Sequence, residues 1–137
     1  MNRQELKMVT LPKICDRRGN LTFIQNGDHI PFDMQRCYWI YDVPAGRQRN
    51  GHAFREAYEL IVAMSGSFEV VITHPDGTVE RHLLNRSYYG LLVPPMTWRE
   101  LDNFSTNSVA MVLTSTTYSP EDYIRDFDTL RKEVSDE

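Results

Sequence analysis

The feature that most constrains the fold is a succession of short β-type runs, each ending at a turn. The clearest pair is Phe68–Thr73 and Thr78–Leu83, because Pro75-Asp76-Gly77 between them is a strong hairpin signal. The other runs of this kind are Leu21–Gln25, Cys37–Val43, Tyr58–Met64, Tyr89–Val93 and Val109–Thr114. Turns recur about every 8–12 residues, which is typical of a sandwich or barrel. We therefore predict an all-β jelly-roll barrel, whose concave mouth is a usual place for a small-molecule site.

The C-terminal segment has a different pattern. Ser119 followed by Pro120 is typical of a helix start, and acidic residues follow in the first turn. Apolar residues then recur at positions 123, 127, 130 and 134, which is the spacing of one helix face. These features predict a C-terminal α-helix packed on the barrel. No internal repeat or linker divides the chain, so we expect one domain over residues 1–137.

Composition limits the class of function. The 137 residues carry a net charge of −4 and no long basic run, which argues against a broad nucleic-acid-binding face. The sequence has no run of 18 apolar residues, so we expect no transmembrane helix. Its N-terminus has no apolar signal core, so a cytoplasmic protein with two reduced cysteines, Cys15 and Cys37, is expected.

The segment Gly51–Glu59 contains the most informative histidine. Metal-binding jelly rolls typically present two histidines at i and i+2, because both side chains then lie on the same face of a strand. Here His52 is followed at i+2 by Phe54, and the proline-rich turn Val93–Arg99 lacks the usual third histidine. The remaining candidate ligands are His52 and either Glu56 or Glu59, and two ligands rarely hold a transition metal tightly. The sequence therefore predicts no metal site.

Without a metal, His52 is a candidate acid or base. The ordinary pKa of histidine, about 6.5, suits proton removal from carbon beside a carbonyl. Tyr38 lies on a run in which alternation places Arg36, Tyr38 and Ile40 on one face. If that face is the barrel interior, the Tyr38 hydroxyl can transfer a proton. Core packing of either side chain is the structural alternative.

The order and spacing of several segments resemble the sugar 3,4-ketoisomerase (WxcM-like) family of cupins. The resemblance covers roughly residues 11–131. The segments are Asp16–Leu21, Ile30–Phe32, Arg36–Asp42, Arg49–Ala53, Leu60–Gly66, Gly90–Trp98 and Tyr118–Phe127.

The resemblance implies a homodimeric cupin that moves the carbonyl of dTDP-4-keto-6-deoxyglucose from C4 to C3 without a metal or organic cofactor. It also implies that an active-site histidine and a tyrosine fourteen residues earlier transfer the protons, and here these are His52 and Tyr38. Family members commonly have His-Ala-His where this chain has His52-Ala53-Phe54.

We expect arginines to bind the charged parts of such a substrate. Arg18 or Arg99 would stabilise a developing oxyanion, and Arg36 and Arg49 would hold the diphosphate. Trp98 is a candidate for stacking on the base or sugar, with core packing as the alternative.

Three other functions stay open from the sequence. A 3,5-epimerase of 4-keto nucleotide sugars uses the same carbon-acid chemistry. Phe54 in place of the second histidine favours a non-catalytic or diverged sugar-nucleotide-binding cupin. A metal-dependent dioxygenase is the third alternative.

Overall fold

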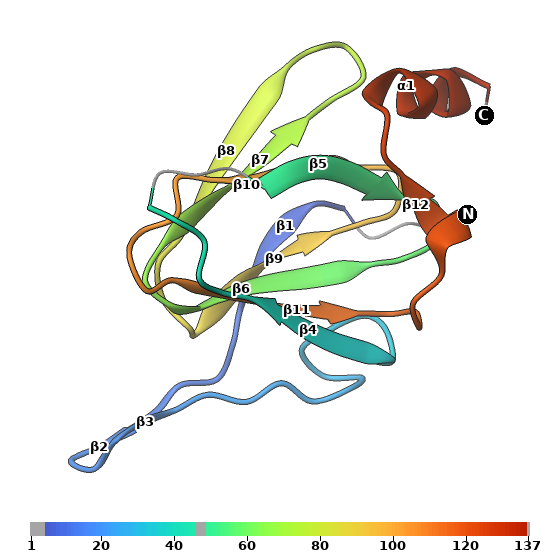
Figure 1. Cartoon of the computed structure of the whole chain (residues 1–137). Coiled ribbons are helices and arrows are strands. Elements are labelled where there is room, and N and C mark those ends of the chain that lie inside the picture. Colours follow the sequence, from blue (N-terminus) through green and yellow to red (C-terminus); the bar gives the residue numbers. More distant parts are fainter. Residues whose placement is uncertain (1–4, 46–48, 137) are drawn as a thin grey trace.

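Two five-stranded antiparallel sheets face each other and account for most of the molecule (Figure 1). The computed structural model describes residues 5–45 and 49–136. The first sheet has the order β1 (Lys7–Thr10), β9 (Tyr89–Val93), β6 (Glu59–Ser65), β11 (Val109–Thr114) and β4 (Arg36–Ile40). The second has the order β12 (Tyr123–Ile124), β5 (Arg49–Phe54), β10 (Trp98–Asp102), β7 (Phe68–Thr73) and β8 (Val79–Leu84). The predicted all-β fold is confirmed.

Apolar side chains fill the space between the sheets. Because side chains alternate along a strand, every second residue points into this interior. Ile61 and Ala63 of β6 face Val70 and Ile72 of β7 in the main core cluster, which Leu101 of β10 joins. This core closes one part of the barrel and leaves the part between β4 and β5 for polar groups.

Both outer faces of the sandwich are also covered. Leu60 and Val62 of β6 pack against Ile24, Ile30 and other residues of the segment that leads into β4. On the second sheet, Ala53, Trp98 and Ile124 pack against Leu130 of the helix α1 (Phe127–Ser135). The predicted packing of a C-terminal helix on the barrel is confirmed, and this helix lies behind the strands that carry the site.

The N-terminal part departs from the predicted strand at Leu21–Gln25. A small hairpin forms there instead, from β2 (Ile14–Asp16) and β3 (Gly19–Leu21), and the chain leaves strand geometry after Leu21. The hairpin projects away from the two large sheets (Figure 1). Ile24 of this segment packs in the outer cover without a strand partner, whereas Phe23 is exposed.

The predicted C-terminal helix is interrupted. Ser119 and Pro120 do begin a turn of helix, but this is a short 3₁₀-helix over Pro120–Asp122. The chain then extends as β12, where Tyr123 pairs with Phe54, and α1 begins only after Asp126. Pairing with the edge of the second sheet therefore replaces the first predicted turns of helix.

The described part of the chain contains no helix long and apolar enough to cross a membrane. Cys15 and Cys37 are both free and exposed.

Candidate active site

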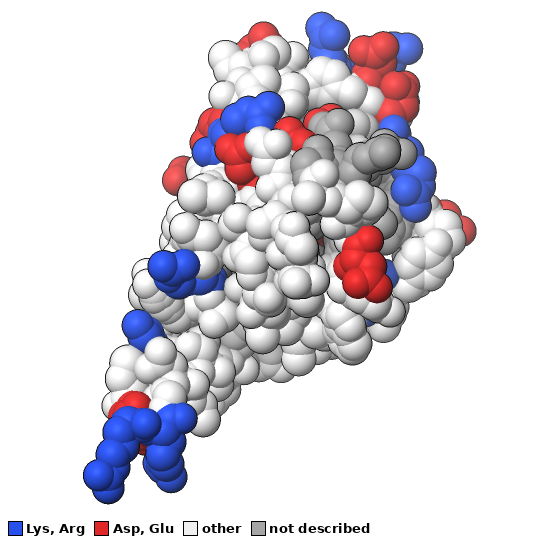
Figure 2. Space-filling model, turned by 60° about the vertical axis from the view of Figure 1, so that its left-hand side comes forward, with Lys and Arg blue, Asp and Glu red and all other residues white. Residues whose placement is uncertain are grey.

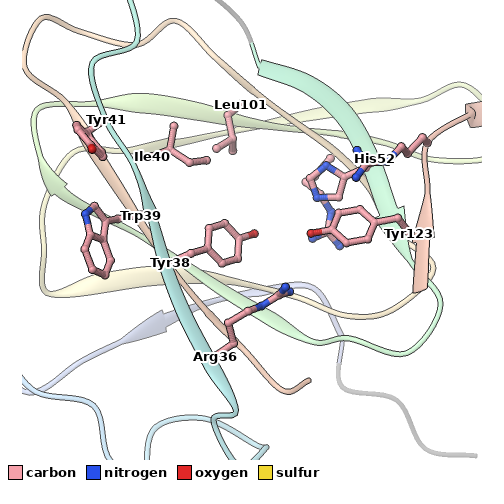
Figure 3. Close-up of a pocket in the computed structure, with 10 residues that line it drawn as sticks. Arg36, Tyr38, Trp39, Ile40, Tyr41, His52, Leu101 and Tyr123 are labelled. Carbon is pink, nitrogen blue, oxygen red and sulfur yellow. The ribbon is translucent and has the colours of Figure 1, made fainter. Parts of the chain in front are cut away.

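A cavity of about 820 Å³ opens between strand β4 of the first sheet and strands β5, β10 and β12 of the second. Its lining consists of Arg36, Tyr38, Trp39, Ile40, Tyr41, His52, Arg99, Leu101, Tyr123 and Arg125. Tyr38 and Tyr123 extend toward each other across it, with His52 beside Tyr123 (Figure 3). Most of its polar groups are cationic or aromatic, which suits a ligand with anionic and sugar-like parts.

Strand β4 supplies one wall. Arg36, Tyr38 and Ile40 are partly buried, whereas Cys37 and Trp39 between them are exposed, so the predicted alternation along this strand is confirmed. The guanidinium carbon of Arg36 lies 5.4 Å from the centre of the Tyr38 ring and 5.6 Å from that of Tyr118. These cation–π contacts hold Arg36 at the cavity mouth.

Strand β5 directs His52 into the cavity through its neighbours. A Cβ atom on Gly51 would lie only 2.6 Å from Trp98 Nε1, so the outer side of the strand has no room for a side chain there. His52 takes the opposite, inner side and pairs across the ladder with Arg99 of β10. Its ring contacts those of Phe54 and Tyr123, with centroids 4.9 and 5.6 Å apart. The imidazole is thus fixed among aromatic rings.

Trp98 does not line the cavity, contrary to its assignment as a substrate-stacking residue. It is 7% exposed and belongs to the cluster beneath α1, where its ring meets Phe127 edge-on at 5.5 Å. The reason is alternation: its neighbour Arg99 faces inward, so Trp98 must face outward. Trp98 therefore packs in the core, as the alternative interpretation of the sequence expected.

A buried carboxylate links two of the cavity residues. Glu59 is 1% exposed. It accepts a hydrogen bond of 2.6 Å from the Tyr38 hydroxyl at Oε2 and pairs at 2.6 Å with Arg99 Nη1 at Oε1. Burial raises the pKa of Glu59, and Arg99 and the Tyr38 hydrogen bond oppose that rise. Burial and then the charge of Glu59 raise the pKa of Tyr38 far above its ordinary value, so the phenol keeps its proton.

Two arginine nitrogens in the cavity wall have no acceptor among the described residues. They are Arg99 Nη2 and Arg36 Nε, and both atoms are buried. Arg99 is otherwise well held, since its Nε donates to the Thr97 carbonyl at 3.1 Å and its guanidinium carbon lies 5.1 Å from the centre of the Phe54 ring. A buried donor left without a partner costs about 1–3 kcal/mol. A ligand oxygen that accepts a hydrogen bond from either atom would remove that cost for it.

One of the predicted arginines lies elsewhere, and the side chain of another is not described. Arg18 is on the β2–β3 hairpin, where it pairs with Asp16 at 2.8 Å and does not line the cavity of its own chain. Figure 2 shows basic side chains gathered at this tip of the molecule. The side chain of Arg49 lies outside the part that the structure describes. Arg36, Tyr38, His52 and Arg99 are the predicted site residues that the structure brings together.

Three further residues belong to this site and were not assigned to it from the sequence. Glu59 was considered only as a metal ligand, and Tyr123 and Arg125 were assigned to a helix. The sequence does contain a sign of Glu59, because it is the acidic residue in an otherwise apolar, doubly covered strand. Among residues 5–45 and 49–136, no group of three histidine, cysteine or acidic side chains is placed to hold a metal ion.

Comparison with known proteins agrees with this geometry. The family model FdtA, described as WxcM-like, C-terminal, matches residues 4–135. A TDP-4-oxo-6-deoxy-alpha-D-glucose-3,4-oxoisomerase from Aneurinibacillus thermoaerophilus is 35% identical over 132 residues, which are 96% of this chain and 94% of that protein.

Solved structures show the same fold. QdtA, a sugar 3,4-ketoisomerase from Thermoanaerobacterium thermosaccharolyticum in complex with TDP, superposes with a TM-score of 0.92 at 30% identity and covers 96% of this chain and 95% of its own. A QdtA variant with one histidine replaced by asparagine, in complex with TDP-4-keto-6-deoxyglucose, gives the same score and identity and covers 96% and 94%. The predicted cupin architecture is therefore confirmed. This chain belongs to the FdtA, WxcM-like family, and it is an isomerase enzyme.

Proposed function

We propose that this enzyme moves the carbonyl group of a dTDP-linked 4-keto-6-deoxyhexose from C4 to C3, with dTDP-4-keto-6-deoxyglucose as the substrate. The observation that carries the proposal is a cavity in which the imidazole of His52, the phenol of Tyr38 and the buried guanidinium of Arg99 converge. The relatives named above act on or bind such compounds. The reaction transfers only protons, so we propose that it uses no metal or organic cofactor.

His52 is the proposed carbon base. The carbonyl at C4 makes the hydrogen on C3 acidic, and the imidazole removes it to give an enediolate. Its position on β5 opposite Arg99 puts the base beside a cation that can stabilise the charge on O4. The imidazolium then delivers a proton to C4, which completes the shift. Phe54 then serves as packing, because its buried ring meets His52 edge-on and lies under Arg99.

Tyr38 and Arg99 are proposed to act on the oxygens. The hydroxyl proton at C3 must leave O3 and reach O4 before the new carbonyl is complete. Tyr38 reaches into the cavity from the opposite sheet and is placed to transfer that proton (Figure 3). Arg99 Nη2 is a preorganised donor for the enediolate oxygen, since the rest of its guanidinium is already held.

Arginines at the mouth are proposed to hold the diphosphate. Arg36 lies between two aromatic rings and keeps a buried Nε available. Arg125 lines the same cavity and stacks 4.3 Å from the centre of the Tyr123 ring. Planar guanidinium groups suit pairs of phosphate oxygens. Arg49 of β5 is a third candidate, assigned from the family resemblance alone.

A homodimer is proposed because the β2–β3 hairpin is poorly covered. A two-stranded hairpin is marginally stable alone in water. Here Ile14 and Leu21 are 54% and 56% exposed. If Arg18 binds substrate, it must do so in the cavity of a second copy, since it is remote from its own. We therefore propose that a partner buries the hairpin and receives Arg18.

Complementation tests the shared site. We expect Arg18→Ala and His52→Asn to be nearly inactive as separate homodimers. Co-expressed as a heterodimer, they leave one cavity with both groups intact, so activity should return. A dimer seen by light scattering without restored activity would remove Arg18 from the site. A monomer would reject the dimer itself.

The activity is tested by incubating the protein with dTDP-4-keto-6-deoxyglucose and following the sugar by ¹³C NMR. The proposal predicts loss of the C4 carbonyl resonance and growth of one at C3. Inversion of stereocentres with the carbonyl retained at C4 would indicate an epimerase instead. Binding without any conversion would indicate a sugar-nucleotide-binding protein.

A further inference from the structure

Glu59 occupies an unusual place for an acidic residue. It is at the start of β6, between β9 and β11, and faces the barrel interior on the same side as Ile61 and Ala63. Burying a carboxylate here is costly unless its partners compensate. Its partners are Tyr38, the proposed oxygen-proton carrier, and Arg99, the proposed oxyanion donor. One inward carboxylate thus joins both groups that act on the substrate oxygens.

We propose that Glu59 is a positioning residue of the isomerisation, which directs the Tyr38 hydroxyl proton away from the substrate and holds it while the enediolate exists. This inference rests on the proposed function. The geometry is specific, because a hydrogen bond of 2.6 Å to Glu59 Oε2 fixes where the phenol proton points. The lone pairs of the Tyr38 oxygen are then presented to the cavity, where they can accept a proton from a sugar hydroxyl.

The proton transfers balance. The O3–H bond of the sugar breaks as a bond from this proton to the Tyr38 oxygen forms. At the same time the original phenol proton moves to Glu59 Oε2. Reversal at the other oxygen returns the Glu59 proton to Tyr38 and delivers the Tyr38 proton to O4. No oxidant or further reactant is needed, and Glu59 and Tyr38 return to their initial protonation states.

The same carboxylate orients Arg99. Its Oε1 accepts from Nη1 and the Thr97 carbonyl accepts from Nε, whereas Nη2 in the cavity wall has no acceptor within residues 5–45 and 49–136. The guanidinium plane is therefore fixed before any ligand binds. Burial raises the pKa of Glu59, which makes a temporary proton on this carboxylate less costly than on an exposed one.

The variant Glu59→Gln isolates this role. Its amide oxygen can still accept from Arg99, but its amide group then donates to the Tyr38 oxygen and reverses that hydrogen bond. The phenol proton would point into the cavity, and the path for the O3 proton would be lost. Removal of the C3 hydrogen by His52 needs no such path. A purely structural defect would instead slow both events together.

The experiment measures both events in deuterium oxide with dTDP-4-keto-6-deoxyglucose. For Glu59→Gln we expect the 3-keto product to form about 100-fold more slowly, in line with the usual worth of proton-transfer groups, while exchange at C3 falls less than tenfold. The control is Glu69→Gln, which removes a carboxylate that pairs with Arg81 outside the cavity, and both rates should stay unchanged.

Equal falls in exchange and product formation in Glu59→Gln, or no fall in either, would overturn the role of Glu59. Absence of exchange and product in the wild-type enzyme would instead overturn the proposed function, and the role of Glu59 with it. If Glu59→Gln fails to fold, Glu59→Asp keeps the charge and draws the carboxylate back by about 1.5 Å, one carbon–carbon bond. A raised ratio of exchange to product there supports the proposal, and an unchanged ratio overturns it.

Discussion

Replacing Arg99 by methionine removes the charge that balances Glu59 inside the barrel. Arg99 is 2% exposed, and its pair with Glu59 is 2.6 Å long. Removing one partner of a buried pair costs about 3–5 kcal/mol, because the other charge is left without compensation. Of the hydrogen-bond donors to Glu59 that the structure shows, the Tyr38 hydroxyl would remain. For a chain of 137 residues, roughly 3–5 °C is lost per kcal/mol, so we expect the Tm to fall by about 10–20 °C.

The double variant Arg99→Met with Glu59→Leu tests that reasoning. Replacing both members of a buried pair by apolar residues is often nearly neutral, so this variant should be more stable than Arg99→Met alone. Urea denaturation followed by circular dichroism gives the free energy of unfolding for the wild type, the two single variants and the double variant. We expect the double variant to be folded but inactive. If the losses of unfolding free energy in the two single variants simply add in the double variant, the view that each charge is stabilised in the core by the other would be refuted.

Three further outcomes follow from the structure. Gly51→Ala should lower the free energy of unfolding by about 1–3 kcal/mol, because its Cβ would overlap Trp98, and an unchanged urea midpoint would contradict this. Phe54→Leu should reduce kcat by roughly ten- to a hundredfold with little change in KM, because it loosens the ring of His52, and a rise in KM alone would argue otherwise. Burial raises the pKa of Glu59, so the native protein binds a proton at this carboxyl more tightly than the unfolded chain does. The stability gained from this protonation is complete below about pH 4.3, the ordinary pKa of glutamate, and is lost as the pH rises through the folded pKa. The unfolding free energy of wild type minus that of Glu59→Gln should therefore fall from pH 4 upward, and a difference that grows with pH would contradict the assigned direction.

Much of the sheet structure could be predicted because period and turn chemistry agree. The predicted runs Phe68–Thr73, Tyr89–Val93 and Val109–Thr114 coincide with β7, β9 and β11. The strands β5 and β10 lack a simple apolar pattern, since each presents charged or polar side chains to the site. Neither was among the predicted strand runs, although residues in both were singled out as site candidates. The polar residues of the site therefore interrupt the apolar pattern by which the strands that carry them could be predicted.

The C-terminal segment shows how tertiary pairing overrides local pattern. Positions 123 and 127 have the spacing of a helix face, yet Tyr123 is used in a strand. Pairing with Phe54 satisfies the edge of the second sheet and turns Tyr123 toward the cavity. Local spacing alone does not contain this information, because it depends on where β5 ends.

The site itself was partly predictable. Alternation on β4 placed Arg36 and Tyr38 on one shared face, which the structure shows to be the inner one, and resemblance singled out His52. The contacts of Glu59 were beyond reach, because they depend on three strands, β4, β6 and β10, that meet only in the folded barrel. Trp98 and Arg99 were both assigned to the substrate, although adjacent residues of a strand point to opposite faces, so only one of them could line the cavity.

The most direct test of the account concerns the imidazole of His52. Wild-type enzyme and His52→Asn are each incubated with dTDP-4-keto-6-deoxyglucose in deuterium oxide, and deuterium at C3 of the substrate and at C4 of the 3-keto product is measured by NMR. We predict rapid incorporation with the wild type and none above background with the variant, although both bind the nucleotide sugar equally well. Incorporation at the wild-type rate by His52→Asn would show that another group takes the hydrogen from carbon.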